Sequence, residues 1–147
     1  MRILHSLGAI TPHPFGFDAN LDDGYRLRVR AMSAELLRVV VEPVDGLPID
    51  RSWMIAPEGD VPWRGRDRDD LAGFTPPKID LRATDDSHAL IAGHFRLTLR
   101  DAPVRLSIEQ RCGATWRSWI ADRRTGGFAL TERGARLRHY QQRDETD

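Results

Sequence analysis

A two-residue alternation of apolar and charged side chains constrains this chain more than any other feature. In residues 25–31, YRLRVRA, arginine takes each even position and an aromatic or apolar residue takes each odd one. Successive side chains of a strand point to opposite faces, so such a stretch has one face toward a core and one toward water. The same alternation recurs in residues 78–83, 91–100, 104–109 and 135–140. These stretches predict β-strands that are buried on one face.

Two of the strand patterns carry more specific expectations. The stretch LLRVVV at 36–41 is almost continuously apolar and β-branched, which predicts a strand covered on both faces. Residues 91–100 are expected to form one strand on which Ile91 shares a face with Phe95 and Leu97.

Turn signals separate the predicted strands, and helical spacing is missing. No stretch of eleven or more residues has apolar residues at helical intervals. Clusters of Asp, Pro and Gly favour turns at 22–24, 45–46, 101–103, 111–113 and 125–127. About eight to ten short strands with frequent turns predict an all-β, antiparallel sandwich or barrel.

The length of 147 residues fits a single domain, residues 1–147. Residues 1–23 are expected to be an irregular leader, because Pro12 and Pro14 fall among glycines and acidic residues. Residues 56–77 are expected to be a long loop, since they hold four prolines and a run of charges.

Composition excludes several classes of protein. The chain has 22 basic and 22 acidic residues, so it lacks the basic excess that nucleic-acid binding uses. It has no apolar run long enough to predict a membrane span. His5 and Ser6 interrupt the apolar N-terminus, which argues against a cleaved signal peptide. The single cysteine, Cys112, forbids an internal disulfide and fits a reducing cytoplasm.

A search for reactive groups predicts no catalytic residue, metal or cofactor. His88 and His94, placed on one strand, would lie about 20 Å apart, too far to share a metal. The acidic stretch 67–73 does not match a calcium-binding loop, because its glycine is misplaced and no glutamate closes it. The sequence has no nucleophile elbow, phosphate loop or dinucleotide fingerprint.

Tryptophan supplies the candidates for binding. Exposed tryptophans stack on flat apolar surfaces such as sugar rings, and the chain has four of them. Trp63, in the long loop, and Trp116 are the candidate carbohydrate-binding residues. Trp116 and Trp119 are three apart on a predicted strand and should face opposite ways, so at least one of them is expected in the core.

Five short segments follow one another in a recognisable order: LRVVV at 37–41, SWMI at 52–55, GHFRLTL at 93–99, RHY at 138–140 and RDETD at 143–147. Taken in this order, they resemble the N-terminal domain of glycoside hydrolase family 31, the α-glucosidase and α-xylosidase family. The resemblance covers residues 24–147, and the Gly-Leu-Gly-Glu motif of the family is absent.

This resemblance implies a galactose-mutarotase-like β-sandwich that stops before a catalytic (β/α)8 barrel. The chain would then be a non-catalytic accessory domain, with the barrel of the same parent chain and an α-linked oligosaccharide as its partners. A homodimer of this chain, which would bury the face expected to contact the barrel, is kept as an alternative. A free-standing carbohydrate-binding module is the alternative, and a mutarotase-like enzyme using Glu109 and His94 is a third reading.

Overall fold

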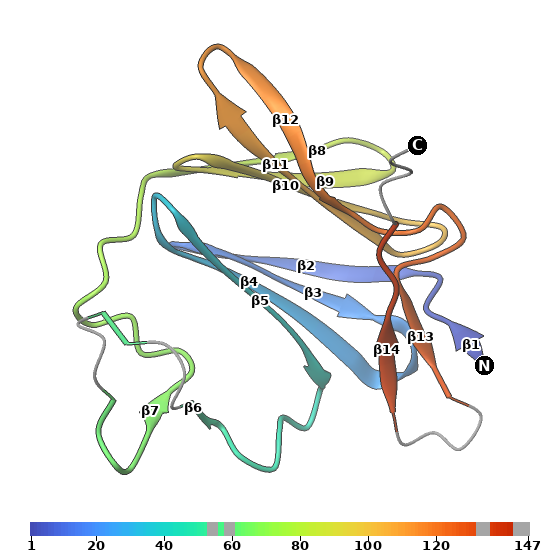
Figure 1. Ribbon diagram of the computed structural model, residues 1–147. Coiled ribbons are helices and arrows are strands. Elements are labelled where there is room, and N and C mark those ends of the chain that lie inside the picture. The colour runs from blue at the N-terminus through green and yellow to red at the C-terminus, as the bar shows by residue number, and fades with distance from the viewer. Residues whose placement is uncertain (53–55, 58–60, 132–135, 143–147) are drawn as a thin grey trace.

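The computed structural model describes residues 1–52, 56–57, 61–131 and 136–142, and strands dominate these residues. Two antiparallel sheets face each other across the core (Figure 1). The one helical element within these ranges is a 3-10 turn, η1 (Asp22–Gly24). No helix among them is long and apolar enough to cross a membrane. The prediction of an all-β antiparallel sandwich is confirmed.

The first sheet is a four-stranded meander in the order β2-β3-β4-β5. Its inward residues are the alternating apolar ones: Leu27, Val29 and Ala31 of β4 are fully buried. The strands are β2 (Leu7–His13), β3 (Gly16–Leu21), β4 (Tyr25–Ser33) and β5 (Leu36–Pro43).

The second sheet is a five-stranded meander in the order β12-β11-β10-β9-β8. Its strands are β8 (Ile79–Ala83), β9 (Ser87–Ala92), β10 (Phe95–Arg100), β11 (Arg105–Cys112) and β12 (Thr115–Ala121). The strands expected within 78–83 and 104–109 are therefore confirmed, as is the hairpin turn at 101–103.

Two smaller sheets complete the structure. A three-stranded sheet in the order β1-β13-β14 stands across one end of the sandwich (Figure 1). The other pairs two short strands in the segment between β5 and β8. The strands of these sheets are β1 (Arg2–Ile3), β13 (Phe128–Leu130), β14 (Leu137–His139), β6 (Arg51–Ser52) and β7 (Arg66–Asp67).

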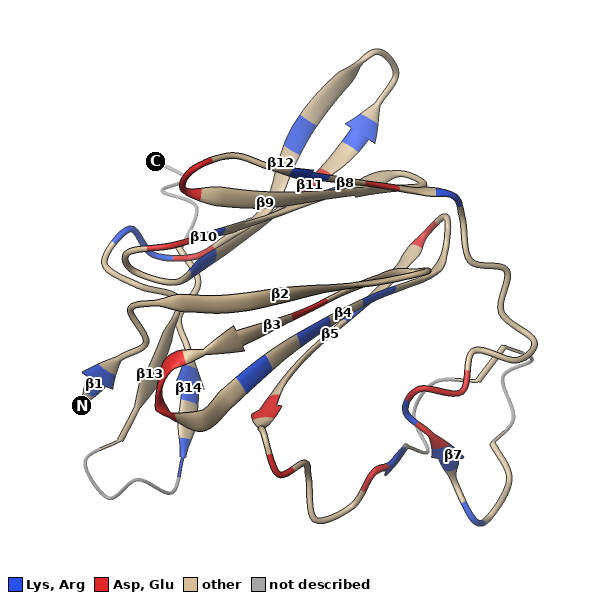
Figure 2. Ribbon diagram, turned by 180° about the vertical axis from the view of Figure 1, so that it is seen from behind, with Lys and Arg blue, Asp and Glu red and all other residues tan. Residues whose placement is uncertain are grey.

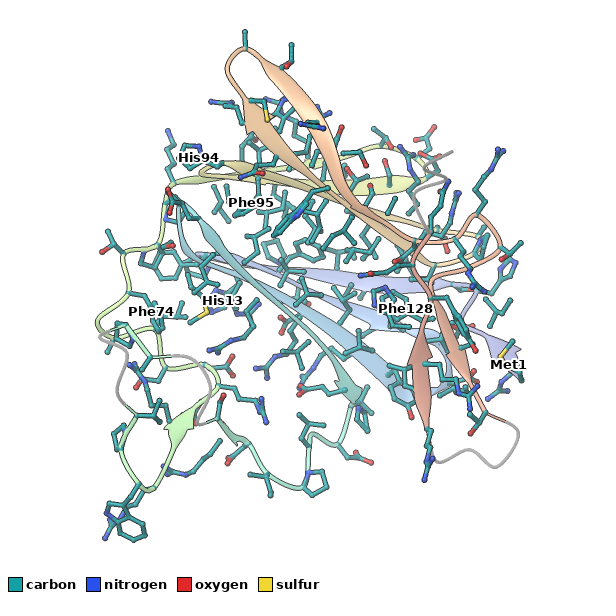
Figure 3. The ribbon with its side chains drawn as sticks, viewed as in Figure 1. Met1, His13, Phe74, His94, Phe95 and Phe128 are labelled. Atoms are coloured by element: carbon teal, nitrogen blue, oxygen red, sulfur yellow. The ribbon has the colours of Figure 1, made fainter. Side chains whose placement is uncertain are left out.

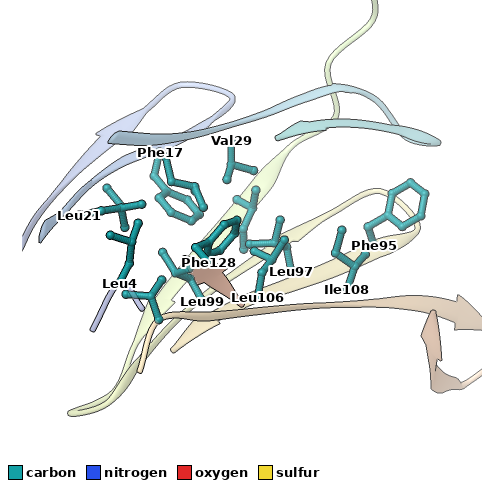
Figure 4. Close-up of a cluster of buried hydrophobic side chains, with 14 of the residues drawn as sticks. Leu4, Phe17, Leu21, Val29, Phe95, Leu97, Leu99, Leu106, Ile108 and Phe128 are labelled. Atoms are coloured by element: carbon teal, nitrogen blue, oxygen red, sulfur yellow. The ribbon is translucent and has the colours of Figure 1, made fainter. Parts of the chain in front are cut away.

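The core fills the space between the two large sheets (Figure 4). Phe17 of the first sheet and Leu97 of the second are fully buried, and Leu4 and Phe128 close the end beneath the three-stranded sheet. Each such side chain contributes roughly 1.5–3 kcal/mol through its removal from water. The core is therefore shared by segments from β1 to β13.

The leader expected over residues 1–23 is instead ordered strand. β2 and β3 form a hairpin in which Pro12 pairs with Phe17. β2 is the edge strand of its sheet, where a proline without an N–H is tolerated. The buried alternation of Phe17, Ala19 and Leu21 fixes the register of β3.

The single strand expected over residues 91–100 is instead two strands joined by a tight turn. β9 ends at Ala92 and β10 begins at Phe95, and these two residues pair across the turn. Gly93 takes a φ of 55°, a conformation that favours glycine. Ile91 therefore does not share a face with Phe95; Leu90 and Ala92 are the buried residues of β9.

Ion pairs attach the segment between β5 and β8, residues 44–78, to the outer face of the first sheet. Arg28 of β4 bridges Glu42, at 3.2 Å, and Asp69 of the segment, at 2.7 Å. Arg38 of β5 donates a hydrogen bond to the carbonyl of Arg68. Charged positions line β4 and the β7 region (Figure 2). β5 is therefore partly covered on both faces, although it is an edge strand.

Candidate functional site

Trp63 lies on the surface of the 44–78 segment, as its position in a predicted loop suggests. Its side chain is 82% exposed, and the guanidinium of Arg64 lies 5.0 Å from the centre of its ring. An exposed indole beside a cation can bind a flat partner. A polar pocket of about 470 Å³ lies next to it, lined by Pro62 and Gly65 together with Arg51, Arg66, Asp67 and Asp70, but Trp63 itself is not among its lining residues.

Trp116 lies on the outer face of the second sheet between two arginines. The guanidinium carbons of Arg96 and Arg111 lie 4.9 and 5.0 Å from its ring centre. A ligand that stacks on this ring has to compete with these cation–π contacts.

Neither Trp116 nor Trp119 lies in the core, so the expectation that one of them is buried is wrong. Trp116 is partly buried and Trp119 is 59% exposed. The reason is a β-bulge: Ile108 pairs with Ile120 and Glu109 pairs with Ser118, which leaves Trp119 as the extra residue. A bulge interrupts strict alternation and re-aims the side chains around it. Trp119 instead stacks on Phe95, with ring centres 5.5 Å apart and planes 17° apart.

An apolar groove opens where the two large sheets end side by side. β5 and β12 are the last strands of their sheets, and the groove between them has a volume of about 330 Å³. Phe128 closes one end of the interior and Phe95 lies towards the other (Figure 3). The lining residues are Val39, Val41, Leu106, Ile108, Ile120, Phe128, Leu137, His139 and Gln141.

A histidine–carboxylate pair lies at one margin of this groove. His139 Nε2 lies 2.6 Å from Asp122 Oδ1, and the Asp122 side chain is fully buried. The other carboxylate oxygen accepts the backbone N–H of Leu106 at 2.7 Å. The His139 ring stacks on Phe128 with centres 4.6 Å apart. Sequence spacing did not reveal this pair, because its members are 17 residues apart and meet only where the segment after β12 lies beside β14.

The hypothesis of a mutarotase-like enzyme requires Glu109 and His94 to act together. In the structure the two residues have different environments. Glu109 forms two hydrogen bonds with Arg96, of 2.5 and 2.8 Å. These bonds hold the pKa of the Glu109 carboxyl below its ordinary value, which makes it a weak base. His94 lies in the β9–β10 turn, not on a strand beside His88. These environments do not favour the pair as a proton-transfer site.

No group of three or more His, Cys, Asp or Glu side chains comes together to hold a metal within the residues that the structure describes. In the acidic stretch, Asp67 and Asp70 accept the backbone N–H groups of Asp69 and Ala72. The bond to Ala72 is the main cause of a lowered pKa at Asp70. Asp69 pairs with Arg28, so these carboxylates stabilise the loop.

Comparisons with known proteins find similarity to this chain only at the level of the fold. No family model matches the sequence, and no curated protein matches it. Among solved structures, the chain is similar to a GH31 dextranase of Flavobacterium johnsoniae. With a mutant complexed with isomaltotriose the TM-score is 0.62 at 14% identity, and with the glucose complex it is 0.62 at 12% identity.

The match extends over most of this chain but over only a small part of the dextranase. In both comparisons it covers 90% of this chain but 14% of the dextranase chain. At this identity the likeness establishes the fold alone. The fold of this chain therefore recurs as a small part of a much larger glycoside hydrolase.

Proposed function

We propose that this chain is a non-catalytic, N-terminal accessory domain of an α-glycosidase of the GH31 type. The parent protein would hydrolyse O-glycosyl bonds in α-linked oligosaccharides, and its (β/α)8 barrel would carry the catalytic residues. The similarity to a small part of a GH31 dextranase supports this proposal. The order of motifs that resembles the family supports it independently.

The apolar groove between β5 and β12 is the observation that carries the proposal. Half-buried Val39 and Val41 face Ile120 and Leu137 across it, and the groove is open on one side. An apolar groove of this kind can receive side chains from another protein surface. We propose that the catalytic barrel of the parent covers it, and that the 44–78 segment shapes the edge of the sugar pocket.

A docking experiment tests this proposal. The chain is mixed with a GH31-type catalytic barrel, which the proposal places in the same parent chain, and binding is measured by titration calorimetry. Binding is expected, and Val41→Asp in the groove should weaken it at least tenfold, because it buries an unpaired charge. Arg82→Asp, on the exposed outer face, is the matched control. If the two do not bind, or if Arg82→Asp weakens binding as much as Val41→Asp, the proposal is wrong.

A free-standing carbohydrate-binding module is the second candidate, and the 82% exposure of Trp63 favours it. In that case maltose and xylose oligosaccharides should bind saturably, and Trp63→Ala or Trp116→Ala should abolish binding. Self-association through the groove is a further outcome, which sedimentation would reveal as a dimer that Val41→Asp dissociates. A cytoplasmic location remains an expectation from the single cysteine.

A further inference from the structure

We propose that Trp119 and a small cavity beside it form a binding subsite for one ring of a neutral sugar. The cavity is lined by Ser118, Trp119, Ile120, Ala121, Gln141 and Gln142. It lies where the end of β12 meets the segment after β14. This site is separate from Trp63 and Trp116 but adjoins the apolar groove, with which it shares Ile120 and Gln141.

The bulge in β12 prepares Trp119 for stacking. As the extra residue of the bulge, Trp119 has no cross-strand partner in β11. Phe95, which is itself buried, supports one face of the indole at 5.5 Å. The indole remains 59% exposed. A rigid aromatic ring backed on one side and open on the other is suited to stack on the apolar C–H face of a pyranose.

The chemistry of the cavity selects a neutral, hydroxyl-rich ligand. Ser118 supplies a hydroxyl, and Gln141 and Gln142 supply amides that both donate and accept hydrogen bonds. Of the described residues that line the cavity, none carries a charge. A charged ligand would lose its hydration on binding without gaining an oppositely charged partner among these residues. Sugar hydroxyls, in contrast, can replace their hydrogen bonds to water with hydrogen bonds to these groups.

The size of the cavity limits the ligand. Its volume is about 170 Å³, which accommodates one sugar ring but not a chain of several. The backbone N–H of Gln142 bonds to the carbonyl of Ala121 at 2.7 Å, and Asp122 pairs with Gln141. These contacts hold the amide-bearing segment against β12, so the polar wall is in place before a ligand arrives.

Sugar titration of the whole chain tests the subsite. Glucose and isomaltotriose are added up to about 100 mM while indole N–H signals are followed by NMR, with the Trp119 signal assigned by its loss in Trp119→Phe. Both sugars should shift the Trp119 signal saturably. Sorbitol has similar hydroxyls but no flat ring, and it should not. Affinity should not change between low and high salt, because none of the described lining residues is charged.

Substitutions decide whether Trp119 is the platform. Trp119→Ala should weaken glucose binding about tenfold or more, and Trp119→Phe should retain part of it. Arg82→Ala, at an exposed position on the outer face of β8, is the control and should leave the affinity unchanged. If Trp119→Ala does not fold, Gln141→Ala serves instead and should weaken binding severalfold. Absence of saturable binding, or binding that persists in a folded Trp119→Ala, would overturn the inference. The docking experiment would remain unaffected by either result.

Discussion

His139 on β14 and Asp122 after β12 are joined by a 2.6 Å hydrogen bond that links the end sheet to the second large sheet. Asp122 also accepts the backbone N–H of Leu106 on β11. A Cβ at Gly127 would lie 1.9 Å from the Asp122 carboxylate, so only glycine fits there. One buried carboxylate thus organises three separate segments around the end of the core.

Replacement of Asp122 should destabilise the fold. Asp122→Ala leaves the buried Leu106 N–H without its acceptor, which costs about 1–3 kcal/mol of unfolding free energy. Urea denaturation at neutral pH measures this loss. Asp80→Ala removes an exposed ion pair with Arg82 and, as the control, should cost about 0.5 kcal/mol or less. Equal effects of the two substitutions would contradict the organising role of Asp122.

Glu109 should make stability depend on pH in the acidic range. Its pKa is lowered in the folded state by the hydrogen bonds from Arg96, so it stabilises the fold above its unfolded pKa. That contribution is lost as pH falls through the folded pKa. The free energy of unfolding of the wild type should exceed that of Glu109→Gln by about 0.5–1 kcal/mol at pH 7, and the difference should shrink as the pH falls below about 4. Denaturant titration across this range measures the difference, and a gap that stays constant as the pH is lowered would refute the assignment.

Gly93 should tolerate no side chain. A Cβ there would lie 2.4 Å from backbone atoms of Ala34 in the β4–β5 turn, and φ is 55°. Gly93→Ala should therefore cost about 2–4 kcal/mol, from backbone strain and from the clash. Gly113 has a similar φ of 62° but open space around it, so Gly113→Ala isolates the strain at about 1–2 kcal/mol. Thermal unfolding should give Gly93→Ala a clearly lower melting temperature than Gly113→Ala.

Arg28 should hold the 44–78 segment against the sheet. Arg28→Gln removes the ion pairs to Glu42 and Asp69 and leaves the buried Glu42 with Arg26 as its remaining salt-bridge partner among the described residues. The segment should then be cut by trypsin severalfold faster at Arg64 and Arg66. Arg100→Gln, on another sheet, should leave the cleavage rate unchanged. Unaltered cleavage of Arg28→Gln would show that other contacts hold the segment.

The alternating pattern predicted most of the large sheets because burial on one face determines which residues a strand can carry. It failed where local geometry interrupts the period. Pro12 made an edge strand look like an irregular segment. Gly93 forms a turn inside a stretch whose alternation looked continuous, and the bulge in β12 changes the direction of the Trp119 side chain. Each of these events involves one residue, too little to alter a periodic signal.

The candidate sites were less predictable than the fold. Trp63 lies in a loop, and its composition was enough to predict exposure. Asp122 and His139 are 17 residues apart, and the pairing of β13 with β14 and of Asp122 with Gln141 brings them together. The groove depends on which strands end each sheet. Contacts that depend on sheet order require the tertiary structure.

Ion pairs and hydrogen bonds attach the 44–78 segment to the outer face of β4 and β5, and none of its described residues belongs to the hydrophobic core between the sheets. Its composition can therefore drift during evolution without disturbing the hydrophobic interior. The same property makes the region around Trp63 a natural place to graft a fluorescent reporter or an affinity peptide while the rest of the molecule keeps its shape.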